Sequence, residues 1–138
     1  MLSGRAELMI KFCDYTTSSS FEEAVNALPY WGQTTRIDLG LEVAMEEMFQ
    51  EINGMRPHKL QNLVLLTDGR QTGVRYDSWR VKFNSEGIRV VVIGVGSVDQ
   101  DSLRHFVLDD SDFHVAEDFT QLLSDSFMKS IALCAPCK

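Results

Sequence analysis

The residues of this sequence best suited to chemistry carry oxygen atoms, and they occupy two predicted loop positions. Thr35 precedes a long predicted helix, and Asp68 follows the apolar run Leu63–Leu66. A hydroxyl and a carboxylate together suit a hard divalent cation such as Mg²⁺, which prefers oxygen ligands. Both residues also have a structural interpretation, because Thr35 can cap the helix and Asp68 can form an Asx turn with Gly69. Spacing alone leaves the two interpretations open.

Other chemical patterns in the sequence are weaker. The run 94–99 contains two glycines between a predicted strand and a predicted helix, but Asp99 stands where a dinucleotide loop needs its third glycine. A carboxylate there repels a pyrophosphate, so we predict a tight strand-to-helix turn. His58, His105 and His114 fall in different predicted elements, which is typical of surface or packing residues rather than metal ligands. No residue pattern predicts an enzyme.

The three cysteines do not form a disulfide framework. Cys13 lies in an apolar stretch, where we predict a small buried hydrophobic residue. Cys134 and Cys137 have the spacing of half a zinc or redox site, without a second pair. We favour a pair that bridges itself or binds a cysteine elsewhere in a longer protein.

Composition limits the classes of protein and partner. The 138 residues suffice for one domain rather than two. The 13 Lys and Arg residues against 20 Asp and Glu residues give a net charge of −7, which argues against nucleic acid and anionic membranes as partners. No apolar run approaches the roughly 20 residues that cross a bilayer, so we expect no membrane insertion. The first seven residues carry charges where a secretory signal needs an apolar core.

Strand-like and helix-like segments alternate along the chain. Apolar runs predict strands over 8–13, 63–66, 88–93 and 113–115, and helical periodicity or capping signals predict helices over 20–28, 37–52, 76–85, 99–107 and 119–132. Ser20 and Glu23 have the spacing of a capping box at the first helix start. This alternation predicts an α/β fold, a doubly wound and mostly parallel open sheet with helices on both faces.

The apolar residues of the predicted elements indicate how they pack. The unbroken run 63–66 predicts a central strand covered on both faces. In the helix predicted over 76–85, Trp79, Val81 and Phe83 are available for packing. The inward faces of two helices are predicted from their spacing: Ile37, Leu41, Ala44, Met48 and Ile52 on one, and Leu122, Leu123, Phe127 and Ile131 on the other. Ligands of such sheets bind beyond the carboxyl ends of the strands, which favours Asp68 as a functional residue.

Three blocks of the sequence, 28–38, 63–70 and 87–96, occur in an order and spacing that resemble a von Willebrand factor type A domain. The resemblance is to the extracellular matrix type, as in matrilins and collagen VI, and extends from about Arg5 to Leu133. The resemblance places the domain at residues 1–133 and leaves a cysteine-containing C-terminal tail at residues 134–138. The resemblance implies a doubly wound, Rossmann-like sheet with a metal-ion-dependent adhesion site at its top.

The resemblance also assigns site residues. Thr35 would coordinate Mg²⁺, or Mn²⁺ or Ca²⁺, through its hydroxyl, and Asp68 would bind it directly or through water. An acidic side chain of the partner would complete the coordination. The third part of the family site, an Asp-x-Ser-x-Ser motif on the first strand, is missing, because the chain begins where the second strand is expected. We therefore expect an N-terminally truncated fold with a partial or lost site.

A run near the N-terminus imitates the missing motif with Asp14, Thr16 and Ser18. Only about one helix separates this run from Thr35, whereas the family interposes a helix and further strands. We therefore favour 8–14 as the second strand followed by a polar turn. In the family the first strand lies between the second and fourth, so its absence predicts two unpaired sheet edges that close directly, pair with another chain, or belong to a longer protein.

These expectations lead to one functional hypothesis and one alternative. The first is a secreted, non-enzymatic adhesion module of the extracellular matrix, whose partner is collagen, another matrix protein or another type A domain. Self-association through an unpaired sheet edge is a further expectation. The alternative is an intracellular type A module that serves as a scaffold within a larger complex.

Overall fold

The computed structural model describes residues 6–29, 36–68 and 76–134. The chain forms two compact units, Met1–Lys59 and Leu60–Lys138. Among the described residues, no helix has both the length and the apolar character needed to cross a membrane.

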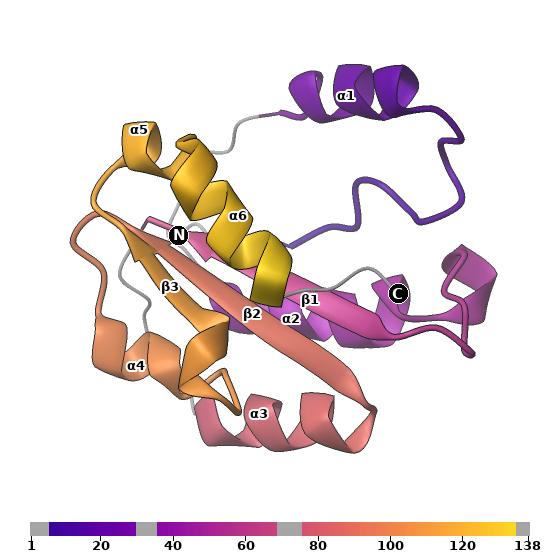
Figure 1. Ribbon diagram of the computed structural model, residues 1–138. Helices are drawn as coiled ribbons and strands as arrows, with labels where there is room; N and C mark the ends of the chain where they lie inside the picture. The colour runs from indigo at the N-terminus through magenta and orange to yellow at the C-terminus, as the bar shows by residue number, and fades with distance from the viewer. Residues whose placement is uncertain (1–5, 30–35, 69–75, 135–138) are drawn as a thin grey trace, which may run out of the picture. The chain divides into compact units, whose positions relative to one another are not determined.

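A parallel sheet is the centre of the second unit (Figure 1). Its strands are β1 (Gln61–Thr67), β2 (Ile88–Val95) and β3 (Phe113–Ala116), in the order β1-β2-β3. All of β1 is aligned with β2, from Gln61 opposite Ile88 to Thr67 opposite Gly94. β3 pairs only with the second half of β2, from Val92 opposite Phe113 onward. The parallel direction predicted for these strands is confirmed.

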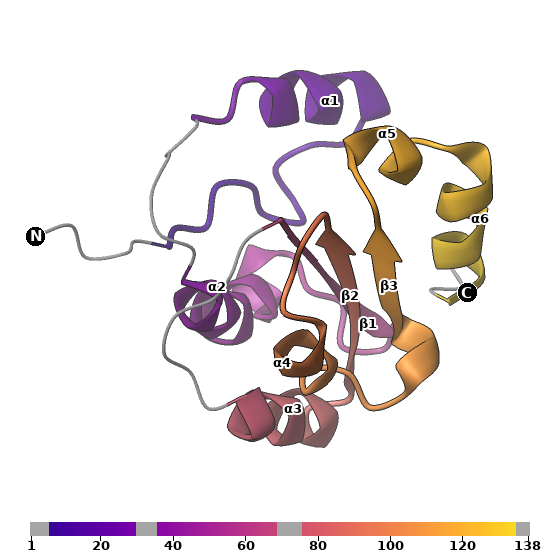
Figure 2. The ribbon, with the colours of Figure 1, turned by 90° about the vertical axis from the view of Figure 1, so that its left-hand side faces the viewer.

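Helices cover both faces of this sheet (Figure 2). α3 (Tyr76–Ser85) and α4 (Gln100–Arg104) lie on one face, and α5 (Phe119–Leu122) and α6 (Asp125–Cys134) lie on the other. Because successive strand side chains point to opposite faces, both faces of β2 enter a core, and Val91 and Val92 are fully buried. The α6 face is built from Ile93, Val95 and Ala116, which pack against Leu122, Phe127 and Ile131. The predicted doubly wound class is confirmed.

The prediction that β1 is central and covered on both faces is wrong. β1 is the edge strand of the described sheet. Its side chains alternate in burial, and Val64 and Leu66 are 49% and 52% exposed. These two residues are aligned with Val91 and Ile93, so they belong to the α6 face, but the α6 core is centred on β2 and β3. An apolar run specifies a strand but not the neighbours that cover it.

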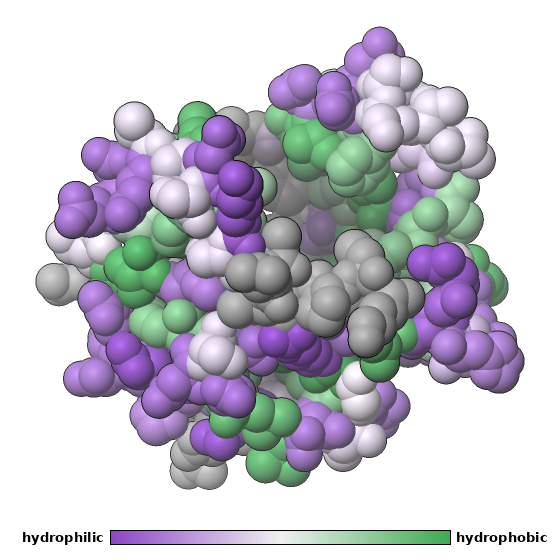
Figure 3. Space-filling model, viewed as in Figure 1, coloured by the Kyte–Doolittle hydropathy of each residue, from purple (hydrophilic) through white to green (hydrophobic). Residues whose placement is uncertain are grey.

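α3 has the predicted bounds but a different inward face. Phe83 is 1% exposed, as its prediction as a packing residue requires, whereas Val81 is 66% exposed. Figure 3 shows a hydrophobic group over α3 at the lower edge of a largely hydrophilic surface. Trp79 and Arg80 are half-buried on this helix.

The last predicted helix is interrupted between Leu122 and Asp125. The Ser124 hydroxyl donates a hydrogen bond to the Gln121 carbonyl at 2.7 Å and accepts one from the Phe127 N–H at 3.4 Å. This side chain therefore ends α5 and caps α6. The break leaves Leu123 exposed, so its predicted inward position is wrong, while Leu122, Phe127 and Ile131 face the core as predicted.

The first unit begins without the strand predicted over 8–13. Residues 6–11 have irregular backbone, and no strand is described anywhere in 6–29 or 36–59. The Lys11 N–H instead donates to Asp14 Oδ2 at 2.8 Å, and the Phe12 N–H donates to the Asn53 carbonyl at 3.1 Å. A strand needs a neighbour for its backbone groups, and the described part of this unit offers none. Cys13 is exposed rather than buried.

α1 (Ser18–Asn26) starts earlier than its predicted capping box. Thr17 is the N-cap, and its hydroxyl oxygen accepts a hydrogen bond from the Ser20 N–H at 3.3 Å. The Ser20 hydroxyl donates to the Thr17 carbonyl at 3.0 Å, so Ser20 lies inside the helix rather than at its cap. Ser and Thr are both good caps, and local backbone geometry decides between them.

The predicted long helix over 37–52 is divided into three pieces. α2 (Ile37–Val43) continues into a π-helical turn, η1 (Ala44–Met48), and after a bend into a 3₁₀ turn, η2 (Glu51–Asn53). Asn53 donates from its side-chain amide to the Glu47 carbonyl at 2.7 Å, which holds the bend. The wider turn changes the helical register, so Phe49 is buried and Ile52, predicted to face inward, is exposed. Gly54 ends η2 in the left-handed region, with a φ of 93°, which glycine adopts without strain.

Candidate metal centre at the carboxyl end of the sheet

β1 places Asp68 at the carboxyl end of the sheet. The strand ends at Thr67, which is buried, and Asp68 follows as an exposed residue. β2 and β3 run parallel to β1 and end at Val95 and Ala116, so all three carboxyl ends lie at one edge. This edge is where ligands of open α/β sheets bind.

The Asp68 carboxylate has no structural role within the described chain. It makes no hydrogen bond or ion pair with residues 6–29, 36–68 or 76–134. An exposed carboxylate without a partner is available as an oxygen ligand. Thr35 and Gly69, on which the paired-ligand interpretation and the Asx-turn interpretation depend, lie outside the described residues.

Asp99, the other acidic residue predicted near this edge, already accepts hydrogen bonds within the chain. Gly96 has a φ of 76° and donates its N–H to the Ala116 carbonyl at 2.8 Å, which forms the predicted tight turn after β2. Asp99 then caps α4, where its carboxylate accepts from the Ser102 N–H at 3.2 Å and from the Ser102 hydroxyl at 2.7 Å. Asp99 therefore stabilises a helix start.

The described residues supply only part of a metal-binding set. No group of three or more His, Cys, Asp or Glu side chains able to hold a metal occurs within the described part of the chain. Asp14, part of the imitation motif, accepts from the Lys11 N–H, Thr16 is exposed, and Ser18 begins α1. His58 and His105 are exposed. The His114 ring packs against the Phe127 ring, with 6.2 Å between the ring centroids.

The start of α2, next to Thr35 in the sequence, contains an ion pair. Arg36 donates from Nε to Asp38 Oδ1 at 2.8 Å and from Nη2 to Asp38 Oδ2 at 2.6 Å. This hydrogen-bonded pairing lowers the pKa of Asp38 and raises the pKa of Arg36. Both Asp38 oxygens are used, so Asp38 is not a ready ligand for a cation beside Thr35.

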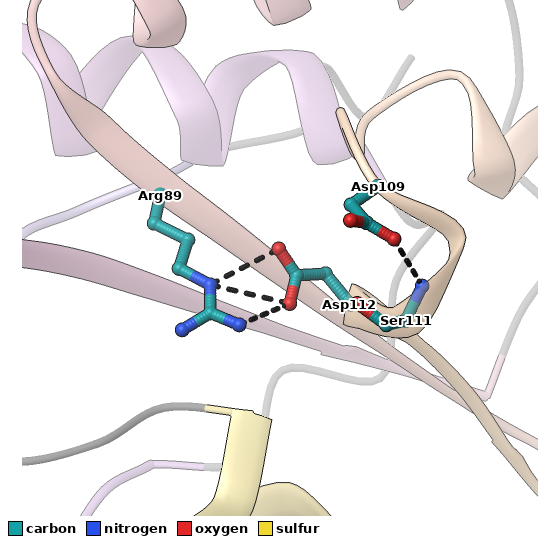
Figure 4. A network of polar contacts seen from close by, with 4 residues as sticks. All are labelled: Arg89, Asp109, Ser111 and Asp112. Atoms are coloured by element: carbon teal, nitrogen blue, oxygen red, sulfur yellow. Dashed lines mark hydrogen bonds and ion pairs between the residues drawn. The ribbon is translucent and has the colours of Figure 1, made fainter.

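A second ion-paired cluster lies at the amino end of the sheet (Figure 4). Arg89 on β2 binds Asp112 in the 3₁₀ turn η3 (Asp110–Asp112), with Nε to Oδ2 at 3.0 Å and Nη2 to Oδ1 at 2.5 Å. Asp109 accepts from the Ser111 N–H at 2.9 Å. Hydrogen bonds from Ser111 lower the pKa of Asp109, and the Arg89 charge adds to that effect. This cluster was not predicted from the sequence, although Arg89 is a lone arginine in the apolar run 88–95 and was a signal for it.

These pKa shifts predict acid destabilisation. Asp38 and Asp109 have folded-state pKa values below their unfolded values, so their stabilisation is present above about pH 4 and is lost as pH falls through the folded-state values. Urea unfolding midpoints should therefore fall as the solution is acidified below about pH 4. Asp109→Asn retains the acceptor for Ser111 but does not titrate, so its midpoint should fall less steeply. If the urea midpoint of Asp109→Asn fell with pH as steeply as that of the unmodified chain, Asp109 would not contribute to the acid destabilisation.

The parallel sheet with helices on both faces defines an open α/β domain, and Asp68 lies at the carboxyl edge of that sheet. A sequence profile described as "von Willebrand factor type A domain" matches residues 2–129. The chain belongs to this family.

The chain is similar to several proteins of that family. It is 30% identical to mouse matrilin-4 over 105 residues, which are 74% of this chain and 17% of matrilin-4. It is 32% identical to the rabbit collagen alpha-1(XII) chain over 122 residues, which are 86% of this chain and 19% of that protein. The chain thus spans less than a fifth of the length of these two curated relatives.

Solved structures support the fold. Proximal thread matrix protein 1 from the mussel byssus superimposes with a TM-score of 0.80 at 22% identity, covering 91% of this chain and 33% of that one. A second structure of the same mussel protein, described as having a zinc-occupied MIDAS motif, gives a TM-score of 0.79 at 23% identity, with the same coverage. At this identity the likeness establishes the fold alone.

Proposed function

We propose that this chain is a non-enzymatic adhesion module of the extracellular matrix that binds a matrix protein at the carboxyl edge of its sheet. The observation that carries the proposal is Asp68, an exposed carboxylate at this edge with no partner in the described chain. Family membership and the similarity to matrilin-4 and a collagen chain support an extracellular location and a matrix partner.

The proposed site uses a divalent cation, Mg²⁺ or alternatively Mn²⁺ or Ca²⁺, with Asp68 and Thr35 as protein ligands. A bound cation of this kind would supply positive charge to which a carboxylate of the partner can bind. Two protein ligands leave further positions for water and for that carboxylate. A cation bridge explains how a chain of net charge −7 can bind an acidic partner.

The variant Asp68→Ala tests this site. Binding of the chain to immobilised collagen, or to an immobilised matrilin, should weaken by at least about tenfold in EDTA and by a similar factor in Asp68→Ala with Mg²⁺ present. Surface plasmon resonance measures both effects. Mg²⁺ at about 100 times its dissociation constant should also raise the unfolding free energy by about 2.7 kcal/mol in the unmodified chain and not in the variant.

Glu117→Ala is the matched control. Glu117 directly follows β3, so it removes one negative charge from the same edge of the sheet. Its binding should stay within about twofold of the unmodified chain, because an exposed carboxylate away from the cation contributes little. Equal binding by Asp68→Ala and Glu117→Ala, or binding that is unchanged by EDTA, would refute the proposed metal site.

A second proposed interaction is self-association through the outer edge of β1. No described strand lies beyond β1, and its sequence Gln61–Thr67 contains no charged residue and no proline, the usual protection of an edge strand. Val64 and Leu66 add half-exposed apolar surface beside that edge. Edge pairing between two copies would bury this apolar surface and add backbone hydrogen bonds along β1.

Sedimentation velocity over a range of concentrations tests this association. The unmodified chain should form dimers as its concentration rises, and Val64→Lys should weaken dimerisation by about tenfold or more, because a buried charge is costly. Val81→Lys adds the same charge to exposed surface on α3 and should leave dimerisation unchanged. Edge pairing would be contradicted if the chain stayed monomeric at every concentration. It would also be contradicted if Val64→Lys and Val81→Lys weakened dimerisation equally.

A further inference from the structure

A concave site lies at the amino end of the sheet, opposite the end that carries Asp68. It is a pocket of about 200 Å³ formed by α3, the first residues of β2 and the segment after α4. Its apolar lining consists mainly of side chains that are nearly fully buried: Phe83, Ile88, Val90 and Phe106. Leu108, at the same pocket, is largely exposed.

One face of α3 supplies polar groups to this pocket. Arg80, Phe83 and Asn84 of α3 line it, and their spacing of three and four residues from Arg80 places them on one side of the helix. Gly87, just beyond the end of α3, lines it too. Arg80 is half-buried and makes no hydrogen bond or ion pair within the described part of the chain. A guanidinium beside apolar surface, without a carboxylate of its own, is suited to receive one.

The carboxylate already at the pocket does not neutralise Arg80. Asp112 also lines the pocket, but its two oxygens are bound by Arg89 through Nε and Nη2. This pair joins the start of β2 to η3 and closes one wall. Arg89 and Asp112 neutralise each other, so the pocket keeps the positive charge of Arg80. The chain as a whole has a net charge of −7.

The size of the pocket limits its occupant. Sites for whole small molecules and cofactors usually measure about 300–1,000 Å³, so about 200 Å³ is better matched by a single large side chain. We infer that this pocket is a docking site for a partner protein segment that inserts an apolar side chain against Phe83 and Phe106 and places a neighbouring carboxylate on Arg80. This site is separate from the proposed metal centre and needs no cation.

Dipeptide mimics test the assignment with the full 138-residue chain in EDTA, so that no metal site contributes. NMR titration with acetyl-Phe-Asp-amide should shift the backbone signals of Gly87 and Leu108 saturably. Acetyl-Phe-Asn-amide, which lacks the charge, should bind about fivefold more weakly, the upper range for a partly exposed ion pair. Acetyl-Ala-Asp-amide should bind more weakly still, because it leaves the apolar part of the pocket empty.

Two variants of α3 separate the pocket from general charge effects. Arg80→Met should abolish the preference for the Asp dipeptide while the Asn dipeptide still binds. Lys82→Met removes the same charge two residues away, where Lys82 lies over the Trp79 ring, and should keep the preference. In the unmodified chain the preference should also shrink as salt is added.

Three results would overturn this inference. The first is a titration in which Gly87 and Leu108 do not shift, and the second is a fivefold preference that persists in Arg80→Met. The third is broadening of the same signals with protein concentration alone, which would assign the pocket to a second copy of this chain. Loss of cation-dependent adhesion in Asp68→Ala has no bearing on any of them, so the two proposals fail independently.

Discussion

Replacing Phe83 with alanine should lower the unfolding free energy by about 3–5 kcal/mol, the range for removing a buried aromatic ring from a core. Phe83 is 1% exposed and is the largest of the fully buried side chains. Its ring lies 6.0 Å from that of Trp79, so the substitution removes an aromatic contact as well as apolar area. Urea denaturation followed by circular dichroism measures the loss.

Val81→Ala is the control for this substitution. Val81 lies two residues away on the same helix and is 66% exposed, so its truncation should change the unfolding free energy by less than about 0.5 kcal/mol. The comparison separates core packing from any effect on helix propensity. If Phe83→Ala cost no more than Val81→Ala, α3 would not pack on the sheet as described.

Breaking the Arg89–Asp112 pair should be costly, and more so from the arginine side. The side chain of Asp112 is 7% exposed and that of Arg89 is 36% exposed. Arg89→Met strands a buried carboxylate and should cost about 2–3 kcal/mol, below the 3–5 kcal/mol of a fully buried pair because water reaches Arg89. Asp112→Asn leaves an arginine that solvent can hydrate, and should cost about 1 kcal/mol.

A double-mutant cycle measures the coupling. The double variant Arg89→Met/Asp112→Asn should cost less than the two single variants summed, because the second substitution removes the stranded charge. The exposed pair Arg36–Asp38 is the comparison, and Arg36→Met should cost below about 1 kcal/mol. Strict additivity at positions 89 and 112 would show that the two side chains do not interact in solution.

The elements of the second unit were predictable because local pattern dominates there. The unbroken apolar runs became β1 and β2, and the helix over 76–85 has its predicted bounds. The pattern did not reveal that β1 lies at an edge, because that depends on whether another strand is present to pair with it. The same limitation explains 8–13, where apolar residues have no strand partner and adopt irregular backbone.

Errors inside helices have a different cause. Regular spacing predicted Ile52 and Leu123 as inward residues, but Ile52 follows a π-helical turn and Leu123 lies in the break between α5 and α6. The π-turn at 44–48 shifts the helical register before Ile52, and the break held by the Ser124 side chain takes Leu123 out of the helix, whereas Phe127 and Ile131 beyond the break still face the core. Such changes depend on single side-chain hydrogen bonds that an apolar periodicity does not contain.

The candidate site was only partly accessible from sequence. The position of Asp68 after an apolar strand followed from the rule that ligands bind at strand ends, and the structure places it there as an exposed residue. The pocket beside Arg80 did not follow, because its residues come from three separate elements. Two charged residues at partly buried positions, Arg80 on α3 and Arg89 on β2, are the signals in the sequence that point toward it.

The parallel direction of β1, β2 and β3 has a mechanical consequence. Asp68 and the Arg80 pocket lie toward opposite ends of these strands, about 20 Å apart along β2, since about six residues rising about 3.3 Å each separate Arg89 at the pocket from Val95, which is level with Asp68. A pull applied between partners held at the two ends would run along the strands, so the backbone hydrogen bonds between β1 and β2 would resist it together, in shear, rather than opening one after another. The second unit would then transmit tension along its own axis.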